Sequence, residues 1–156
     1  MVARKRKSGK RSGASSKRRR KAPTLIFFID ECLGGPLLAG ALRSAGAQAE
    51  LARSHFPEGA KDVDWLPVVG ARGWVVLTKD RYIRRRELEI EALINAGVRA
   101  FVLTAADLTG PEQAAVFVKA LRKITRICQG SRKALVGAVG RGGSVSLLPL
   151  PRRRRR

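Results

Sequence analysis

The feature that most constrains the fold is a short apolar run, Leu25 to Ile29, that ends abruptly in two carboxylates, Asp30 and Glu31. A run of this length, rich in β-branched and aromatic residues, is typical of a strand buried on both faces, as in a parallel sheet with helices on either side. Ligands bind at the carboxyl ends of the strands in open α/β sheets. Both acids are therefore candidates for chemistry rather than for solubility.

The same pattern of a buried run followed by polar residues returns later in the chain. The run at 74–77 is followed by Thr78-Lys79-Asp80, and a further apolar run covers 98–103. Because helical stretches separate these runs, the sequence predicts a three-layer α/β/α sandwich with a mostly parallel sheet. The segments 135–139 and 144–148, joined by a Gly-rich turn, predict a C-terminal hairpin at the edge of the sheet or outside it.

Capping residues mark where the helices begin. Pro36 follows a glycine pair and suits the first turn of a helix, and Asp62 is a natural N-cap with Asp64 in the first turn. Thr109 and Glu112 have the spacing of a capping box, which predicts the start of the most regular helix.

The net charge of +21 is spread unevenly. Residues 1–23 hold eleven Lys and Arg and no acid, and Arg152 to Arg156 add five more, which leaves the body of the chain near +5. We expect residues 1–23 and 151–156 to be disordered basic tails around a single domain at 24–150. Such tails bind polyanions in a salt-dependent way, or serve only solubility.

Several classes of protein do not fit the sequence. It has no Gly-rich phosphate loop of the Walker or Rossmann type, no apolar stretch long enough to cross a bilayer and no signal-peptide core, so we expect a cytoplasmic protein without membrane contact. Cys32 and Cys128 are too few and too far apart for a disulfide framework or a zinc site. His55 is the only histidine, which excludes a metal site built on imidazoles.

Three aspartates are predicted to converge on one edge of the sheet: Asp30, Asp64 and Asp80. Clustered carboxylates repel one another and usually hold a cation, and oxygen-only ligands favour Mg²⁺ or Mn²⁺. Such an ion suits in-line hydrolysis of a phosphodiester. Each acid also has an ordinary alternative: Asp30 as a cap, Asp64 as a partner of the helix dipole, and Asp62 as an N-cap more than a ligand.

Three segments resemble a known family: TLIFFIDECLGG, DVDWLP and GWVVLTKDRYIRRR. In this order they are similar to PIN-like domains, in particular the group related to VapC-type toxins of bacterial toxin–antitoxin systems, over about Thr24 to Ile127. The resemblance implies a metal-dependent ribonuclease fold with Asp30, Asp64 and Asp80 at the acidic metal-binding positions. It also implies that Thr78 orients Asp80 or a water on the metal.

The chain departs from this family at one position. Many PIN domains carry a fourth acid shortly after T-x-D, where this sequence has basic and apolar residues at 81–83. Glu31, Asp62 and Asp107 are the candidates to replace it.

The first hypothesis is therefore an Mg²⁺- or Mn²⁺-dependent endoribonuclease, the toxin of a two-component system. In this hypothesis Lys79, Arg81 and the run Arg84, Arg85 and Arg86 hold RNA phosphates. By resemblance, an antitoxin protein and a second copy of the chain are the expected protein partners. The alternative is a catalytically silent nucleic-acid-binding protein of the same fold, in which the acids are structural and the tails supply affinity.

Overall fold

A six-stranded sheet forms the centre of the computed structural model, which describes residues 24–33 and 35–152. The predicted tail at 1–23 lies outside the described residues, as do residues 153–156 of the tail predicted at 151–156. The strand order is β2-β1-β3-β4-β5-β6, and every neighbouring pair is parallel except the antiparallel pair β5–β6. The strands are β1 (Ile26–Ile29), β2 (Gln48–Leu51), β3 (Val75–Thr78), β4 (Arg99–Leu103), β5 (Leu135–Val139) and β6 (Val145–Leu148).

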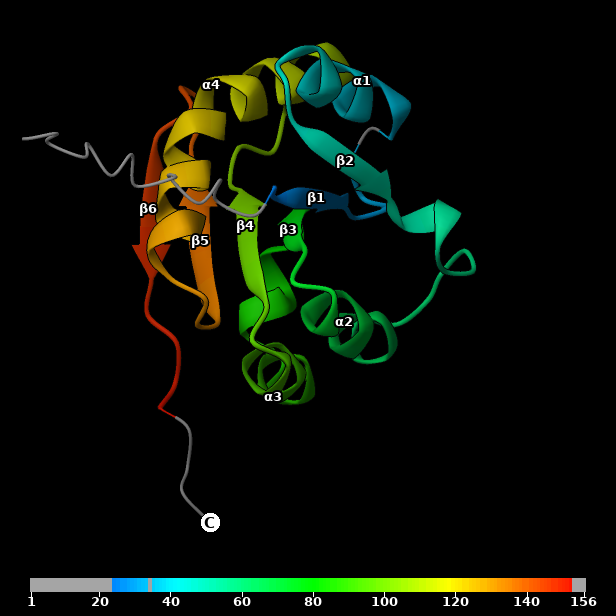
Figure 1. Ribbon diagram of the computed structural model, residues 1–156, viewed down its shortest axis with the longest axis vertical. Coiled ribbons are helices and arrows are strands. Elements are labelled where there is room, and N and C mark those ends of the chain that lie inside the picture. The colour runs from blue at the N-terminus through cyan, green and yellow to red at the C-terminus, as the bar shows by residue number, and fades with distance from the viewer. Residues whose placement is uncertain (1–23, 34, 153–156) are drawn as a thin grey trace, which may run out of the picture.

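Four α-helices cover the two faces of the sheet, so the predicted three-layer sandwich is confirmed (Figure 1). They are α1 (Pro36–Ser44), α2 (Asp62–Ala71), α3 (Glu87–Ala96) and α4 (Gly110–Gly130), with short 3₁₀ turns η1 (Ala52–Ser54) and η2 (Arg81–Arg84). Helices α1 and α4 pack on one face and α2 and α3 on the other, which divides the core into two apolar clusters. None of the helices in the described part of the chain is long and apolar enough to cross a membrane.

The central strands are buried because their side chains are apolar on both faces. In β1, Phe27 and Ile29 enter the cluster under α1 and α4, whereas Phe28 enters the cluster under α2 and α3. All residues of β3 and β4 are buried as well. The predicted C-terminal hairpin is confirmed, and of the two places predicted for it, at the edge of the sheet or outside it, the structure has the edge, since β6 is the last strand in the order.

Two predicted helix starts have different outcomes. The capping box is confirmed: the Thr109 hydroxyl accepts from the Glu112 N–H at 3.3 Å, and the Glu112 carboxylate accepts from the Thr109 N–H at 3.4 Å. The prediction that Asp62 is an N-cap is wrong, because Lys61 holds that position and makes no side-chain cap bond. Asp62 is the first helical residue, and its carboxylate accepts a 3.1 Å hydrogen bond from the Trp65 indole N–H instead.

Helices α2 and α3 approach each other unusually closely at their carboxyl-terminal ends. A Cβ added to Gly70 would lie 2.4 Å from the Ala96 carbonyl oxygen and 2.6 Å from the Ala96 Cβ. The glycine is therefore required at this crossing, where the two backbones come together. Since the amino-terminal ends of the same two helices carry acidic residues, this contact bears on the site described next.

Candidate metal centre

Asp30 and Asp80 follow two strands that lie side by side in the sheet. Strand β1 pairs in parallel with β3, and the Asp30 N–H continues the ladder by donating to the Leu77 carbonyl at 3.0 Å. Because the two strands run in the same direction, both aspartates leave the sheet at the same edge.

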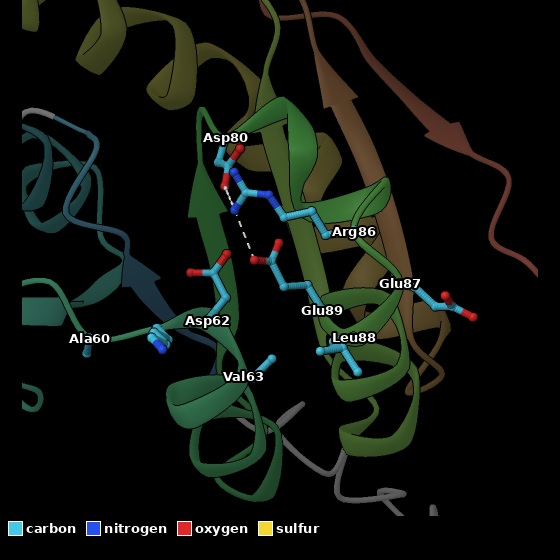
Figure 2. A pocket seen from close by; sticks show the side chains of 9 residues that line it. Ala60, Asp62, Val63, Asp80, Arg86, Glu87, Leu88 and Glu89 are labelled. Carbon is cyan, nitrogen blue, oxygen red and sulfur yellow. Dashed lines mark hydrogen bonds and ion pairs between the residues drawn. The ribbon is translucent and has the colours of Figure 1, made fainter.

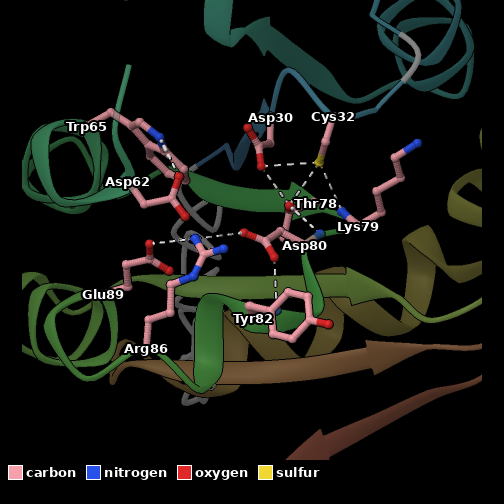
Figure 3. A network of polar contacts seen from close by, with 10 residues as sticks. All are labelled: Asp30, Cys32, Asp62, Trp65, Thr78, Lys79, Asp80, Tyr82, Arg86 and Glu89. Atoms are coloured by element: carbon pink, nitrogen blue, oxygen red, sulfur yellow. Dashed lines mark hydrogen bonds and ion pairs between the residues drawn. The ribbon is translucent and has the colours of Figure 1, made fainter. Parts of the chain in front are cut away.

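Thr78, the last residue of β3, links these two positions. Its side chain is fully buried, and its hydroxyl donates to Asp30 Oδ2 at 2.7 Å while accepting from the Asp80 N–H at 3.0 Å. The side chain of Asp30 and the backbone of Asp80 are therefore held by one hydroxyl group (Figure 3).

Helices α2 and α3 bring two further carboxylates to this edge. Asp62 lies in the first turn of α2 and Glu89 in the first turn of α3, where the helix dipole favours negative charge. One oxygen from each of Asp62, Asp80 and Glu89 lies within 4.8 Å of the others, and all three residues are half-buried (Figure 2). The nearby Glu87 side chain points away from this group.

The setting of Asp62 disfavours its charged form. Burial first, and then the neighbouring charges of Asp30, Glu89 and Asp80, together raise the pKa of its carboxyl to about 6. The hydrogen bond from Trp65 acts in the opposite direction. A carboxyl in such a setting gains from a nearby cation, because the cation removes the repulsion that holds the proton on.

One basic side chain partly supplies that cation. Arg86 Nη1 lies 2.9 Å from Glu89 Oε1 and 4.0 Å from Asp80 Oδ2 (Figure 3). The Asp80 carboxylate also accepts a 2.9 Å hydrogen bond from the Tyr82 N–H, so its direction is fixed by the backbone of η2.

Asp30 and Cys32 form a second polar group beside the three acids. The Cys32 thiol lies 3.3 Å from Asp30 Oδ2 and 3.3 Å from the Thr78 hydroxyl, and it accepts from the Lys79 N–H at 3.4 Å. Burial, followed by the charge of Asp30, raises the pKa of this thiol to about 11. Cys32 is therefore a neutral packing and hydrogen-bonding residue near neutral pH.

The other predicted acids lie apart from the cluster. Asp64 and Asp107 are exposed, and the Glu31 carboxylate accepts from the Gly59 N–H at 3.3 Å. Of the sequence-predicted acids, the structure thus brings Asp62 and Asp80 together, with Asp30 joined to the Asp80 segment through Thr78.

The predicted basic residues flank the same edge of the sheet. Four of them are exposed and Arg84 is half-buried. The exposed ones are Lys79, Arg81, Arg85 and Arg86. An open pocket beside the acids is lined by Asp62, Asp80, Arg86 and Glu89, with the apolar side chains of Val63 and Leu88 at its rim (Figure 2).

Comparison with known proteins identifies the family of the chain. Residues 25–105 match the family described as PIN like domain. The chain belongs to the PIN-like domain family. It is also 30% identical over 104 residues, which are 64% of this chain and 75% of the relative, to a Mycobacterium tuberculosis (strain ATCC 25618 / H37Rv) protein named "Putative ribonuclease VapC45". No solved structure matches the chain.

The acids of this PIN-like domain have the chemistry of a hard divalent cation site. All the candidate ligand atoms are carboxylate oxygens, which Mg²⁺ and Mn²⁺ prefer. In addition, Glu89 Oε2 is buried without a hydrogen-bond partner within the described part of the chain. A buried, unpartnered carboxylate oxygen is costly, and an ion among the three acids would satisfy it.

Glu89 is the acid of this cluster that sequence reasoning missed. It lies nine positions after Asp80, and the 3₁₀ turn η2 covers the first four of the eight residues between them. The available signal was the pair Glu87 and Glu89 in the first turn of α3. That pair is also what a helix dipole favours, so the sequence pattern alone did not separate the two roles.

Proposed function

We propose that this PIN-like domain is a metal-dependent endoribonuclease that hydrolyses RNA phosphodiester bonds. The observation that carries the proposal is the group Asp62, Asp80 and Glu89, whose oxygens lie within 4.8 Å of one another at the carboxyl edge of the sheet. The name of the Mycobacterium tuberculosis relative supports the same reaction class.

In this proposal Asp62, Asp80 and Glu89 hold an Mg²⁺ or Mn²⁺ ion, and Asp30 completes the acidic edge. The ion would activate water and neutralise charge that develops at phosphorus. Thr78 keeps the Asp30 carboxylate in one orientation through its 2.7 Å hydrogen bond. The Tyr82 N–H does the same for Asp80. Such preorganisation lowers the cost of assembling four negative groups around one cation.

Substrate binding is assigned to the exposed basic residues Lys79, Arg81 and Arg85, with the half-buried Arg84 beside them. Lys79 precedes Asp80 and the three arginines follow it within five residues, so a phosphate held by them would lie near the carboxylates. The pocket beside the acids is open to solvent, as a site for a polymer has to be. These features favour single-stranded RNA, whose backbone can bend into the site.

The cellular role that we propose is the toxin of a toxin–antitoxin pair, on the basis of the family resemblance. Induced expression should then arrest bacterial growth, and the Asp80→Asn variant should relieve the arrest. Normal growth on induction of the active enzyme would reject this role without rejecting the nuclease.

The decisive experiment is cleavage of labelled single-stranded RNA with Mn²⁺ or with EDTA, beside the Asp30→Asn/Asp80→Asn double variant. We expect cleavage that requires both the metal and the aspartates, and RNA binding that persists in the variant because negative charge has been removed. Binding without cleavage, across several RNAs and both metals, would favour the catalytically silent alternative.

A further inference from the structure

The guanidinium of Arg86 lies against the carboxylates that would hold a metal ion. Its Nη1 lies 2.9 Å from Glu89 Oε1 and 4.0 Å from Asp80 Oδ2, so one guanidinium contacts two of the three clustered carboxylates. A metal ion bound by the same oxygens would compete with these contacts, since two cations cannot share them without strong repulsion.

The surroundings of Arg86 allow its side chain to leave. The residue is the N-cap of α3 and follows the turn η2, so no regular element has to unpack when the side chain moves. Its side chain is 58% exposed, and its guanidinium carbon lies 5.7 Å from the centre of the Tyr82 ring. An arginine side chain stays protonated across the usual pH range. When Arg86 moves away from the carboxylates, it is therefore still a cation and requires another anionic partner.

An RNA phosphate at the open pocket provides that anion. Arg86 lines this pocket together with Asp62, Asp80 and Glu89. The planar guanidinium matches two phosphate oxygens through parallel hydrogen bonds. If the side chain turned from the carboxylates into this pocket, it would exchange carboxylate partners for phosphate partners.

We propose that Arg86 is a displaceable internal counter-ion: it neutralises Asp80 and Glu89 when no divalent ion is bound, and it turns to an RNA phosphate when the ion takes the carboxylates. This inference rests on the proposed metal site. It makes the metal and the RNA phosphate bind cooperatively, because each favours the same position of Arg86.

The chain contains a matched control for this idea. Arg85 precedes Arg86, carries the same charge and is exposed, yet it has no ion pair among residues 24–33 and 35–152. Arg85→Gln and Arg86→Gln therefore remove the same charge from adjacent positions, and only the second removes the contacts with Asp80 and Glu89. Arg85 is proposed to hold RNA, which a Mn²⁺ titration does not contain, so Arg85→Gln serves as a control for metal binding alone.

The test is titration of the full chain with Mn²⁺ by calorimetry, in the wild type, Arg86→Gln and Arg85→Gln. We expect Arg86→Gln to bind Mn²⁺ roughly tenfold more tightly, equivalent to about 1.4 kcal/mol, and Arg85→Gln to differ from the wild type by less than about twofold. Without metal, Arg86→Gln should also melt at a lower temperature than Arg85→Gln, and Mn²⁺ should remove the difference.

A second titration tests the release of Arg86 toward phosphate. Adenosine 5′-monophosphate has no phosphodiester to cleave, so its effect on Mn²⁺ affinity can be measured at equilibrium. We expect the nucleotide to tighten Mn²⁺ binding more in the wild type than in Arg86→Gln, by a factor of about three or more. An equal effect in both proteins would refute the phosphate half of the proposal.

The outcomes separate this inference from the proposed function. Mn²⁺ binding by the wild type with equal or weaker binding by Arg86→Gln would refute the counter-ion role and leave the nuclease proposal intact. Equal tightening by both glutamine variants would refute it too, because a general change of charge would then suffice. Absence of Mn²⁺ binding in all three proteins would refute the metal site and, with it, both proposals.

Discussion

Thr78 Oγ1 lies 2.7 Å from Asp30 Oδ2 and 3.0 Å from the Asp80 backbone nitrogen, so one buried hydroxyl holds the two aspartates that end neighbouring strands. Thr78→Val keeps the shape of the side chain but removes both hydrogen bonds. We expect the free energy of unfolding to fall by about 1–3 kcal/mol, because the buried polar groups of Asp30 and Asp80 lose their partner.

Urea denaturation measures this loss of stability, and the RNA cleavage assay measures its effect on the site. Thr78→Ser is the matched control, since it restores the hydroxyl without the methyl group and should recover cleavage. If Thr78→Val cleaves RNA as fast as the wild type, the hydroxyl does not position Asp30.

Asp62 and Asp64 provide a second comparison. They lie two residues apart in α2, but only Asp62 belongs to the acidic cluster. We expect Asp62→Asn to weaken Mn²⁺ binding by tenfold or more, equivalent to at least about 1.4 kcal/mol, and Asp64→Asn to change it by less than about twofold. Calorimetric titration of both variants checks this, and the opposite order would restore Asp64 as the ligand.

The choice between these two aspartates shows how far the sequence leads. Short apolar runs followed by polar residues predicted the central strands, and they predicted that Asp30 and Asp80 lie at the ends of two of them. Residues two apart on a helix point about 200° away from each other, so the ligand depends on which residue begins α2. The sequence suggested Asp62 as the N-cap, whereas Lys61 holds that place.

Glu89 could not be assigned for a different reason. Its position depends on how α3 packs against α2, and this contact is made by residues such as Gly70 and Ala96 that carry no charge. Local patterns define the ends of helices, but the meeting of two helix starts is a tertiary property.

A pH prediction follows from the raised pKa of Asp62. Its carboxyl has a pKa of about 6 in the folded chain and about 3.8 when unfolded, so the folded state binds the proton more tightly. Asp62 therefore costs no stability below about pH 4, and its cost grows as the pH rises from 4 to 6.

Asp62→Asn should remove this cost. In EDTA above pH 7 we expect the variant to be more stable than the wild type by about 1 kcal/mol, less than the full shift implies because solvent screens a half-buried group. Thermal melts between pH 4 and 8 measure the difference, which should vanish near pH 4. A difference that is constant with pH would contradict the prediction.

Arg99 is the buried cation of β4 and is not part of the acidic cluster. Its guanidinium donates to the carbonyls of Cys128 at 2.8 Å, Gly73 at 3.0 Å and Ser131 at 3.3 Å. It thereby ties the end of α4 to the segment before β3. We expect Arg99→Leu to lower the free energy of unfolding by about 2–4 kcal/mol, because three carbonyls lose a charged donor.

Urea denaturation checks this value, with exposed Arg132→Leu as the control for loss of charge. Mn²⁺ affinity of the folded Arg99→Leu protein should stay unchanged, since none of its partners lies in the acidic cluster. A loss of Mn²⁺ affinity in fully folded Arg99→Leu protein would show that the contacts of Arg99 and the acidic cluster are coupled.

Helices α2 and α3 are in close backbone contact where Gly70 meets Ala96. Asp62 and Glu89 lie in the first turns of these two helices, about a dozen ångströms from that contact along the helix axes. A small change in the distance between the helices at this contact therefore changes the distance between the two carboxylates. The spacing of the two carboxylates therefore depends on a glycine that contacts neither of them.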